Sequence, residues 1–157
     1  MATSPNSIIT AQTPNTGVKN VVLSTAMTNT KAWDGTEAVG TAMALVYTAG
    51  ANGSRVDKLV VRPSGTNGAA PSGASSATVL HVFINNGSGA NTTASNNSFF
   101  GQLTVASFTP SATAALTGYE YPINVVLQAG EKVYVGLTTA VGGTNDAIAV
   151  SCFGADL

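Results

Sequence analysis

Short apolar runs interrupted by polar residues dominate the chain from Val18 onward. In KVYVGL (132–137), every second residue is apolar, beginning with Val133. This period of two is typical of a strand that turns one face to a core and the other away from it. The upstream run 119–127 alternates in the same way, and a short Gln-Ala-Gly connection joins the two. They are therefore predicted to form a hairpin.

The same pattern predicts eight strands. We place them at 18–25, 40–48, 54–62, 77–85, 98–107, 119–127, 131–139 and 146–153. Asn-Gly pairs between strands can supply the positive φ that tight reversals need, and they lie at 52–53, 67–68 and 86–87. Prolines are expected to end strands, at Pro63, Pro71 and Pro110. The best helical candidate, 37–47, contains an internal glycine and ends in β-branched and aromatic residues, so a strand is favoured there.

Eight short strands without a helical layer predict an all-β fold, a two-sheet antiparallel sandwich of the jelly-roll type. In that topology, the first, third, sixth and eighth strands form one sheet and the other four form the second. An immunoglobulin-like sandwich is the alternative, with about seven strands and, in antibody-type domains, characteristic Cys and Trp residues. The chain has one Cys and one early Trp, which cannot supply that pattern.

The predicted strand 77–85 has large side chains on both faces, because Leu80, Val82 and Ile84 are interleaved with His81 and Phe83. Such a strand lies inside a sheet or is covered by another subunit. His81 and Phe83 are therefore candidates for an oligomer interface in which they face their own copies around a symmetry axis.

The chain divides into an extended N-terminal arm, 1–17, and a β-sandwich domain, 18–157. The first eighteen residues carry no charge, and Pro5 and Pro14 bias the residues before them toward extended backbone. Ile8 and Ile9 laid on a partner's groove contribute roughly 2 kcal/mol or more each before ordering costs. A disordered tail is the alternative. The candidate binding residues of the arm are Pro5, Asn6, Ile8, Ile9, Thr10, Gln12 and Pro14.

Charged residues make up only 8% of the chain, and the net charge is −1. Such a chain has no long-range field to attract phosphate backbones or an anionic lipid surface, so neither nucleic acid nor a membrane is an expected partner. No stretch approaches the ~20 apolar residues of a membrane span. The first positive side chain is Lys19, and no secretory leader is recognisable before it, so synthesis in the cytoplasm is expected.

Few residues carry candidate chemistry. The single cysteine, Cys152, lies in the apolar run IAVSCF and is interpreted as a core residue. His81 has no acidic neighbour along its strand to make it a base or a ligand. Asp34 and Glu37 in WDGTE can bind a hard cation only weakly, and a turn anchored by Trp33 is favoured. The sequence therefore predicts no enzyme, no cofactor and no metal.

Three basic residues share the predicted strand 54–62, with Asp57 among them. Strict alternation places Lys58 and Arg62 on one side of the strand, with Arg55 and Asp57 on the other, so no nucleic-acid-binding stripe is expected. These side chains are interpreted as polar decoration of an exposed sheet face. The alternative is contact with an acidic neighbour across a subunit boundary.

Six stretches together carry a resemblance to a known family: PNSIITAQTP, AWDGTE, TAGANGSRVDKLVVRPSG, ATVLHVFINNGS, LQAGEKVYVGL and AIAVSCFGADL. Across most of its length the chain resembles the head decoration, or cement, proteins of tailed bacteriophages, which are capsid auxiliary proteins. The resemblance implies a jelly-roll-like domain, commonly trimeric, that binds the outside of an icosahedral capsid. It also implies that an extended terminus runs over neighbouring major capsid protein subunits.

The expected function is thus that of a structural virion protein, made in the host cytoplasm and placed on the capsid exterior. There it would stabilise the shell by bridging major capsid protein subunits as a homotrimer. The alternative is a receptor- or glycan-binding β-sandwich of a phage tail tip or surface appendage. For that role, Trp33, Asp34, Tyr119 and Tyr121 are the candidate contacts. The aromatic content of 6% is low for such a site.

Overall fold

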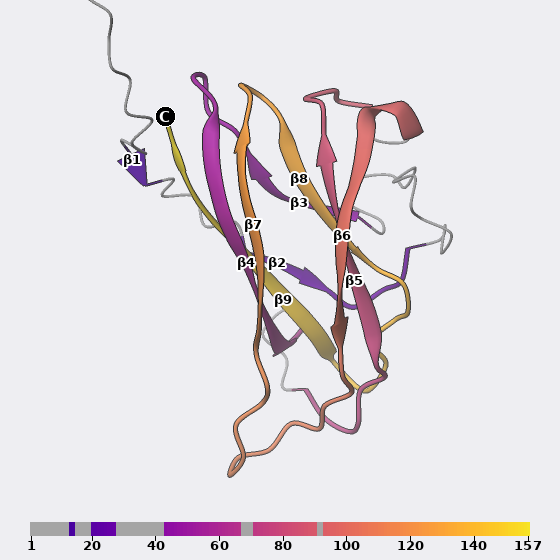
Figure 1. Cartoon of the computed structure of the whole chain (residues 1–157). Coiled ribbons are helices and arrows are strands. Elements are labelled where there is room, and N and C mark those ends of the chain that lie inside the picture. Colours follow the sequence, from indigo (N-terminus) through magenta and orange to yellow (C-terminus); the bar gives the residue numbers. More distant parts are fainter. Residues whose placement is uncertain (1–12, 15–19, 28–42, 67–70, 91–92) are drawn as a thin grey trace, which may run out of the picture.

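The structure, a computed structural model, describes residues 13–14, 20–27, 43–66, 71–90 and 93–157 (Figure 1). Within these ranges the chain forms the strands β1 (Thr13–Pro14), β2 (Asn20–Leu23), β3 (Met43–Thr48), β4 (Ser54–Gly65), β5 (Thr78–Asn85), β6 (Asn97–Val105), β7 (Tyr119–Leu127), β8 (Lys132–Leu137) and β9 (Asp146–Asp156). A single 3-10 turn spans Ala94–Asn96. Among the described residues there is no helix long and apolar enough to cross a lipid bilayer.

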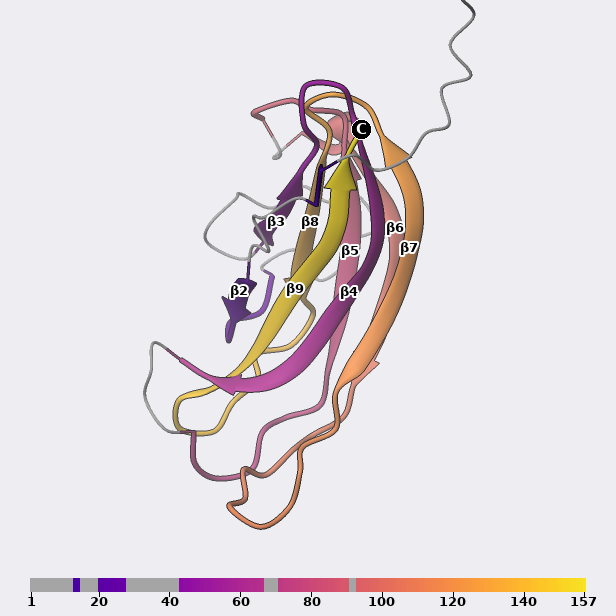
Figure 2. The ribbon, with the colours of Figure 1, turned by 90° about the vertical axis from the view of Figure 1, so that its left-hand side faces the viewer.

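The strands form two antiparallel sheets that pack face to face (Figure 2). One sheet has the order β2-β9-β4-β7, and the other has the order β3-β8-β5-β6. The first, third, sixth and eighth predicted strands therefore do share a sheet. The two-residue β1 adds to the first sheet, beside the end of β9. The prediction of a two-sheet jelly-roll sandwich is confirmed.

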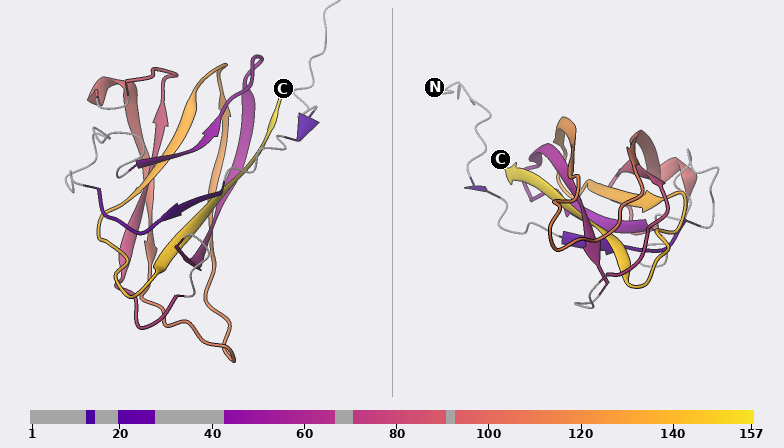
Figure 3. Two further views of the ribbon diagram at one scale, coloured as in Figure 1. Left: turned by 180° about the vertical axis from the view of Figure 1, so that it is seen from behind. Right: turned by 90° about the horizontal axis from the view of Figure 1, so that it is seen from below.

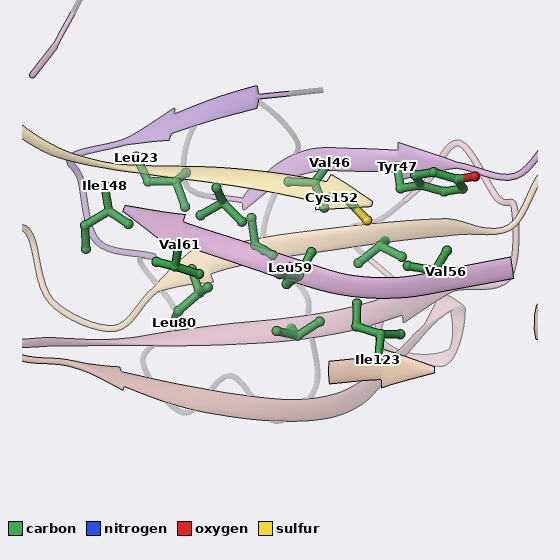
Figure 4. Close-up of a cluster of buried hydrophobic side chains, with 14 of the residues drawn as sticks. Leu23, Val46, Tyr47, Val56, Leu59, Val61, Leu80, Ile123, Ile148 and Cys152 are labelled. Atoms are coloured by element: carbon green, nitrogen blue, oxygen red, sulfur yellow. The ribbon is translucent and has the colours of Figure 1, made fainter. Parts of the chain in front are cut away.

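The core lies between the sheets and is built from inward residues of the strands β2 to β9 (Figure 4). β4 contributes Val56, Leu59 and Val61, each fully buried. Burial of such a side chain contributes about 1.5 to 3 kcal/mol. At one margin of the sandwich β2 lies against β3 (Figure 3). At the opposite margin, the rings of Phe100 on β6 and Tyr121 on β7 meet edge to face, with centroids 6.4 Å apart.

The strand β5 is an inner strand with both faces buried. It lies between β8 and β6, and Leu80 and Val82 point into the main core. On its other face Phe83 belongs to a second buried cluster with Met27, Met43 and Tyr134. The prediction of an inner strand for this segment is confirmed.

Two expectations about turns have different outcomes. Gly53 and Gly87, the second residues of two Asn-Gly pairs, both have φ of 90°, as predicted. The expectation that Pro63 ends a strand is wrong, because β4 continues through it to Gly65. The pairing of β4 with β7 stops at Val61, so beyond that point β4 has only β9 beside it. A proline is tolerated there because no strand on the open side needs its missing N–H.

Candidate binding surface

The root of the predicted arm lies at the edge of β9. Within β1, Thr13 pairs with Asp156 and Pro14 with Ala155, both antiparallel. Further along the same edge, β2 pairs with residues 148–151 of β9. β1 and β2 therefore follow one edge of β9 in succession, and segment 1–12 joins the body at the C-terminal end of that strand. Proline suits this place because an edge strand does not need every backbone donor.

A polar network holds the C-terminal end of β9 in place beside this root. The Ser54 hydroxyl donates to the Asp156 carboxylate at 2.6 Å and accepts the Gly50 amide N–H at 2.9 Å. The Tyr47 hydroxyl donates to the same carboxylate oxygen at 3.5 Å. Gly50 leaves room for the carboxylate, since a Cβ there would lie 2.7 Å from Asp156 Cγ. The network thus ties β3, β4 and the turn between them to the strand that pairs with β1.

The outer face of the β2-β9-β4-β7 sheet carries five of the thirteen charged residues of the chain. The five are Arg55, Asp57, Lys58, Arg62 and Glu120. The same face also carries the exposed apolar residues Val22, Val126 and Phe153. Between Val56 and Lys58, β4 has one residue more than β9, and β7 has one residue more than β4. The extra residue in β4 opposite β9 is a β-bulge. Because of it, the inward-facing residues Val56 and Leu59 are three positions apart instead of two.

The prediction that Arg55 and Asp57 face away from Lys58 and Arg62 is therefore wrong, since the bulge brings all four to the outer face. Four of the five charged residues on this face form two ion pairs. Arg55 Nε lies 2.8 Å from Asp57 Oδ1, and Lys58 Nζ lies 2.8 Å from Glu120 Oε1. The hydrogen bond from Lys58, and then its positive charge, lower the pKa of Glu120. Both ion pairs are exposed, so they stabilise the fold little.

The residues predicted for binding have different placements. Pro5, Asn6, Ile8, Ile9, Thr10 and Gln12 lie outside the described residues, as do Trp33, Asp34 and Glu37. Pro14 is at the arm root. His81 and Phe83 are 4% and 0% exposed, and both rings pack edge-on against Phe99. Neither side chain presents surface to a second copy in the described part of the chain, so the predicted interface has no support there.

The tyrosines proposed for a glycan site are engaged at the β6–β7 margin. The Tyr119 hydroxyl accepts the Ala106 amide N–H at 3.1 Å, and the Tyr121 hydroxyl lies against Gly101. Both rings are half-buried. Cys152 is a core residue, as predicted, at 1% exposure. Its burial, helped by the charge of Asp57, raises the thiol pKa to about 12, so almost no thiolate forms at neutral pH.

Comparisons with known proteins give little beyond this geometry. No protein family model matches the chain, and no curated protein matches it. Among solved structures, it is similar to a chain in the structure of the infectious bursal disease virus Gt strain, with a TM-score of 0.27 and 15% identity. That match covers 92% of this chain and 32% of the other, so this chain spans about a third of its length. A likeness this weak carries no functional argument.

Proposed function

We propose that this chain is a structural virion protein of a tailed bacteriophage that binds the outside of the capsid and bridges major capsid protein subunits. The observation that carries the proposal is the path of β1 along the edge of β9. It joins segment 1–12 to the body at the end of a strand, where that segment can reach a neighbouring protein. The jelly-roll topology supports the proposal because it is the fold that the family resemblance implies.

The binding mode follows from the composition of the segment. It carries no charged side chain, its branched aliphatic side chains are Ile8 and Ile9, and Pro5 favours an extended backbone. An extended peptide binds by adding main-chain hydrogen bonds to a sheet edge, or by seating alternate side chains in shallow pockets. In a homotrimer, three such arms raise the total affinity, because binding of the first confines the other two to a small volume around their sites.

Co-sedimentation with capsids tests this proposal. The particles are assembled from the major capsid protein of the same phage, without the chain, and wild type is compared with a variant that lacks residues 1–12 but keeps β1. We expect the deletion to abolish co-sedimentation. Replacing both Ile8 and Ile9 by Ser removes two apolar contacts and should weaken binding at least about tenfold.

The matched control removes the same kind of contact from the body. Val126→Ser deletes an exposed apolar side chain, 58% accessible, on the outer face of the sheet. It should bind capsids as wild type does. Full binding by the deletion variant, together with weak binding by Val126→Ser, would refute the proposal and assign the contact to the sheet face.

A further inference from the structure

The exposed apolar side chains of the body gather on one surface. Among the described residues, the exposed large apolar side chains are those of Val22, Val126 and Phe153. They come from three different strands, yet all three lie on the outer face of the β2-β9-β4-β7 sheet. In Figure 2 this sheet lies in front of the other one, so its outer face is turned to the viewer. Exposed apolar side chains that share one face are typical of a surface that contacts another protein.

Phe153 projects from this face because its outward neighbours along β9 are small. Cys152 lies in the core, so the residues on either side of it point outwards. The outward row of the strand therefore consists of Ala149, Ser151, Phe153 and Ala155. The Phe153 side chain is 40% exposed. An aromatic ring that stands among small side chains lets another surface approach and enclose it, and such anchors carry much of the energy of an interface.

The charges of this face favour a partner with the same mixture of charges. Three basic and two acidic residues lie on it, and the two ion pairs leave Arg62 as the surplus positive charge. A strongly basic or strongly acidic partner would meet like charge on part of the face. A second copy of the chain brings both signs, so that Arg62 of one copy can meet a carboxylate of the next. The net charge of −1 means that copies repel one another little.

The area of the face is of the order that a contact between copies needs. β4 has 12 residues and β9 has 11. Strands of this length extend about 35 Å, and four strands side by side span about 15 Å, which gives a projected area of about 500 Å². Side-chain relief makes the accessible area larger than the projected one. Because a standard interface buries about 800 Å² on each partner, this face supplies most of such a contact.

From these observations we propose that copies of this chain associate through the outer face of the β2-β9-β4-β7 sheet, with Phe153 directed towards the symmetry axis of a homotrimer. The inference rests on the homotrimer of the proposed function and identifies the surface that forms it. Val126 lies on the edge strand β7, at the rim of this surface. Truncation of a side chain at the rim of an interface has little effect on binding.

An axis near Phe153 also brings the arm roots of the three copies close together. Phe153 precedes Asp156, the residue that pairs with Thr13 of β1, by three positions. About 10 Å of β9 therefore separates Phe153 from the arm root of its own copy. Three roots held near one axis keep the arms within reach of neighbouring sites on one capsid, which is the arrangement that favours their joint binding.

Light scattering after size exclusion tests this surface on the free protein. At micromolar concentration wild type should be a trimer and Phe153→Ser a monomer, because the substitution removes the central apolar side chain of every copy. Val126→Ser is the matched control: it removes an exposed apolar side chain from the rim and should remain a trimer. A far-UV circular dichroism spectrum equal to that of wild type shows that Phe153→Ser is folded. A monomeric wild type, or a folded Phe153→Ser that is still a trimer, overturns the proposal.

Cross-linking provides a second readout that keeps Phe153 in place. Ala155→Cys puts a thiol on the outward row of β9, and a short bismaleimide should join copies of this variant into covalent dimers. Ser98→Cys, at an exposed position on β6, is the control and should give none. The native Cys152 does not interfere, because it is buried and its thiol pKa is raised to about 12. Equal cross-linking of the two variants, or none with Ala155→Cys, overturns the proposal. If Phe153→Ser does not fold, this result decides.

Capsid binding separates this inference from the proposed function. A monomeric Phe153→Ser keeps residues 1–12 and should still co-sediment with capsids, but at least about tenfold more weakly than wild type, because one arm binds in place of three. A monomer that binds capsids as wild type does would uphold the interface and remove three-armed binding from the proposed function. A trimeric Phe153→Ser that no longer binds capsids would assign this face to the capsid and overturn the inference.

Discussion

Replacing Ser54 by alanine tests the network that supports the arm root. Ser54 is fully buried, and its hydroxyl is both the donor to Asp156 and the acceptor for the Gly50 amide. Alanine removes both hydrogen bonds without adding volume. The Asp156 carboxylate keeps the longer contact from Tyr47, whereas the Gly50 amide loses the acceptor that Ser54 provides.

The cost can be worked from these contacts. A hydrogen bond to a charged group contributes about 1.5 to 3 kcal/mol, and an amide left unsatisfied costs about 1 to 3 kcal/mol. Gly50 and Asp156 are only half-buried, so water compensates part of each loss. The expected sum is about 2 to 3 kcal/mol. With a urea m-value of about 2 kcal/mol/M, the midpoint should fall by about 1 to 1.5 M.

Urea unfolding followed by intrinsic fluorescence measures this change. The slope should stay constant, since the surface exposed on unfolding is unaltered. Ser98→Ala on β6, which changes an exposed serine, is the control and should leave the midpoint in place. A midpoint shift for Ser54→Ala below about 0.3 M, or one no larger than the control's, would refute the role of this network.

Three further results are expected. Cys152, with its thiol pKa raised to about 12, should not react with DTNB at pH 8 in the native protein and should react fully in urea. NMR titration should find the Glu120 pKa below its usual value, and Lys58→Met should raise that pKa because it removes the hydrogen bond and the charge that lower it. The small stabilisation from this carboxylate is present above its unfolded pKa and is lost as the pH falls through the lowered folded pKa. Light scattering after size exclusion should return a trimer at micromolar concentration, and a monomer would remove the basis for three-armed binding.

Strands β7 and β8 could be predicted because alternate residues of each lie in or against the main core. The predicted bounds of β7 match those observed, and β8 differs only at its ends. Periodicity identifies such strands without reference to the rest of the chain. The strand order followed from the count of eight, because few two-sheet topologies accommodate that number. Sheet membership was thus a consequence of the fold class rather than of any local signal.

The bulge in β4 was missed although the sequence carries a sign of it. The buried residues Val56, Leu59 and Val61 are separated by three and then two positions. A regular strand keeps its inward residues two apart, so the gap of three at Asp57-Lys58 marks one extra residue. An unbroken period of two residues through this segment wrongly placed Arg55 and Asp57 on the face opposite to Lys58 and Arg62. The position of the bulge could be inferred from the spacing of the apolar residues, not from that of the charged ones.

Asp146 had no comparable signal. Along the chain it is a single carboxylate in TNDAIA, and nothing there marks it as buried. Its burial depends on the end of β4, the residue after β2 and the β8–β9 loop meeting at one place. Only the tertiary fold brings these segments together, so the burial of Asp146 could not be predicted from the sequence.

The charges of the body bear on how the protein would recognise a capsid. On the outer sheet face, Lys58 pairs with Glu120 and Arg55 with Asp57, so these charges largely cancel at a distance. These two pairs therefore contribute little long-range attraction for a partner. Under the proposed function, attachment would rely on backbone pairing and apolar contact, and the segment before β1 is composed of uncharged residues that can supply both. The proposed arm and the ion-paired sheet face thus favour the same mode of recognition, in which short-range contact takes the place of electrostatic attraction.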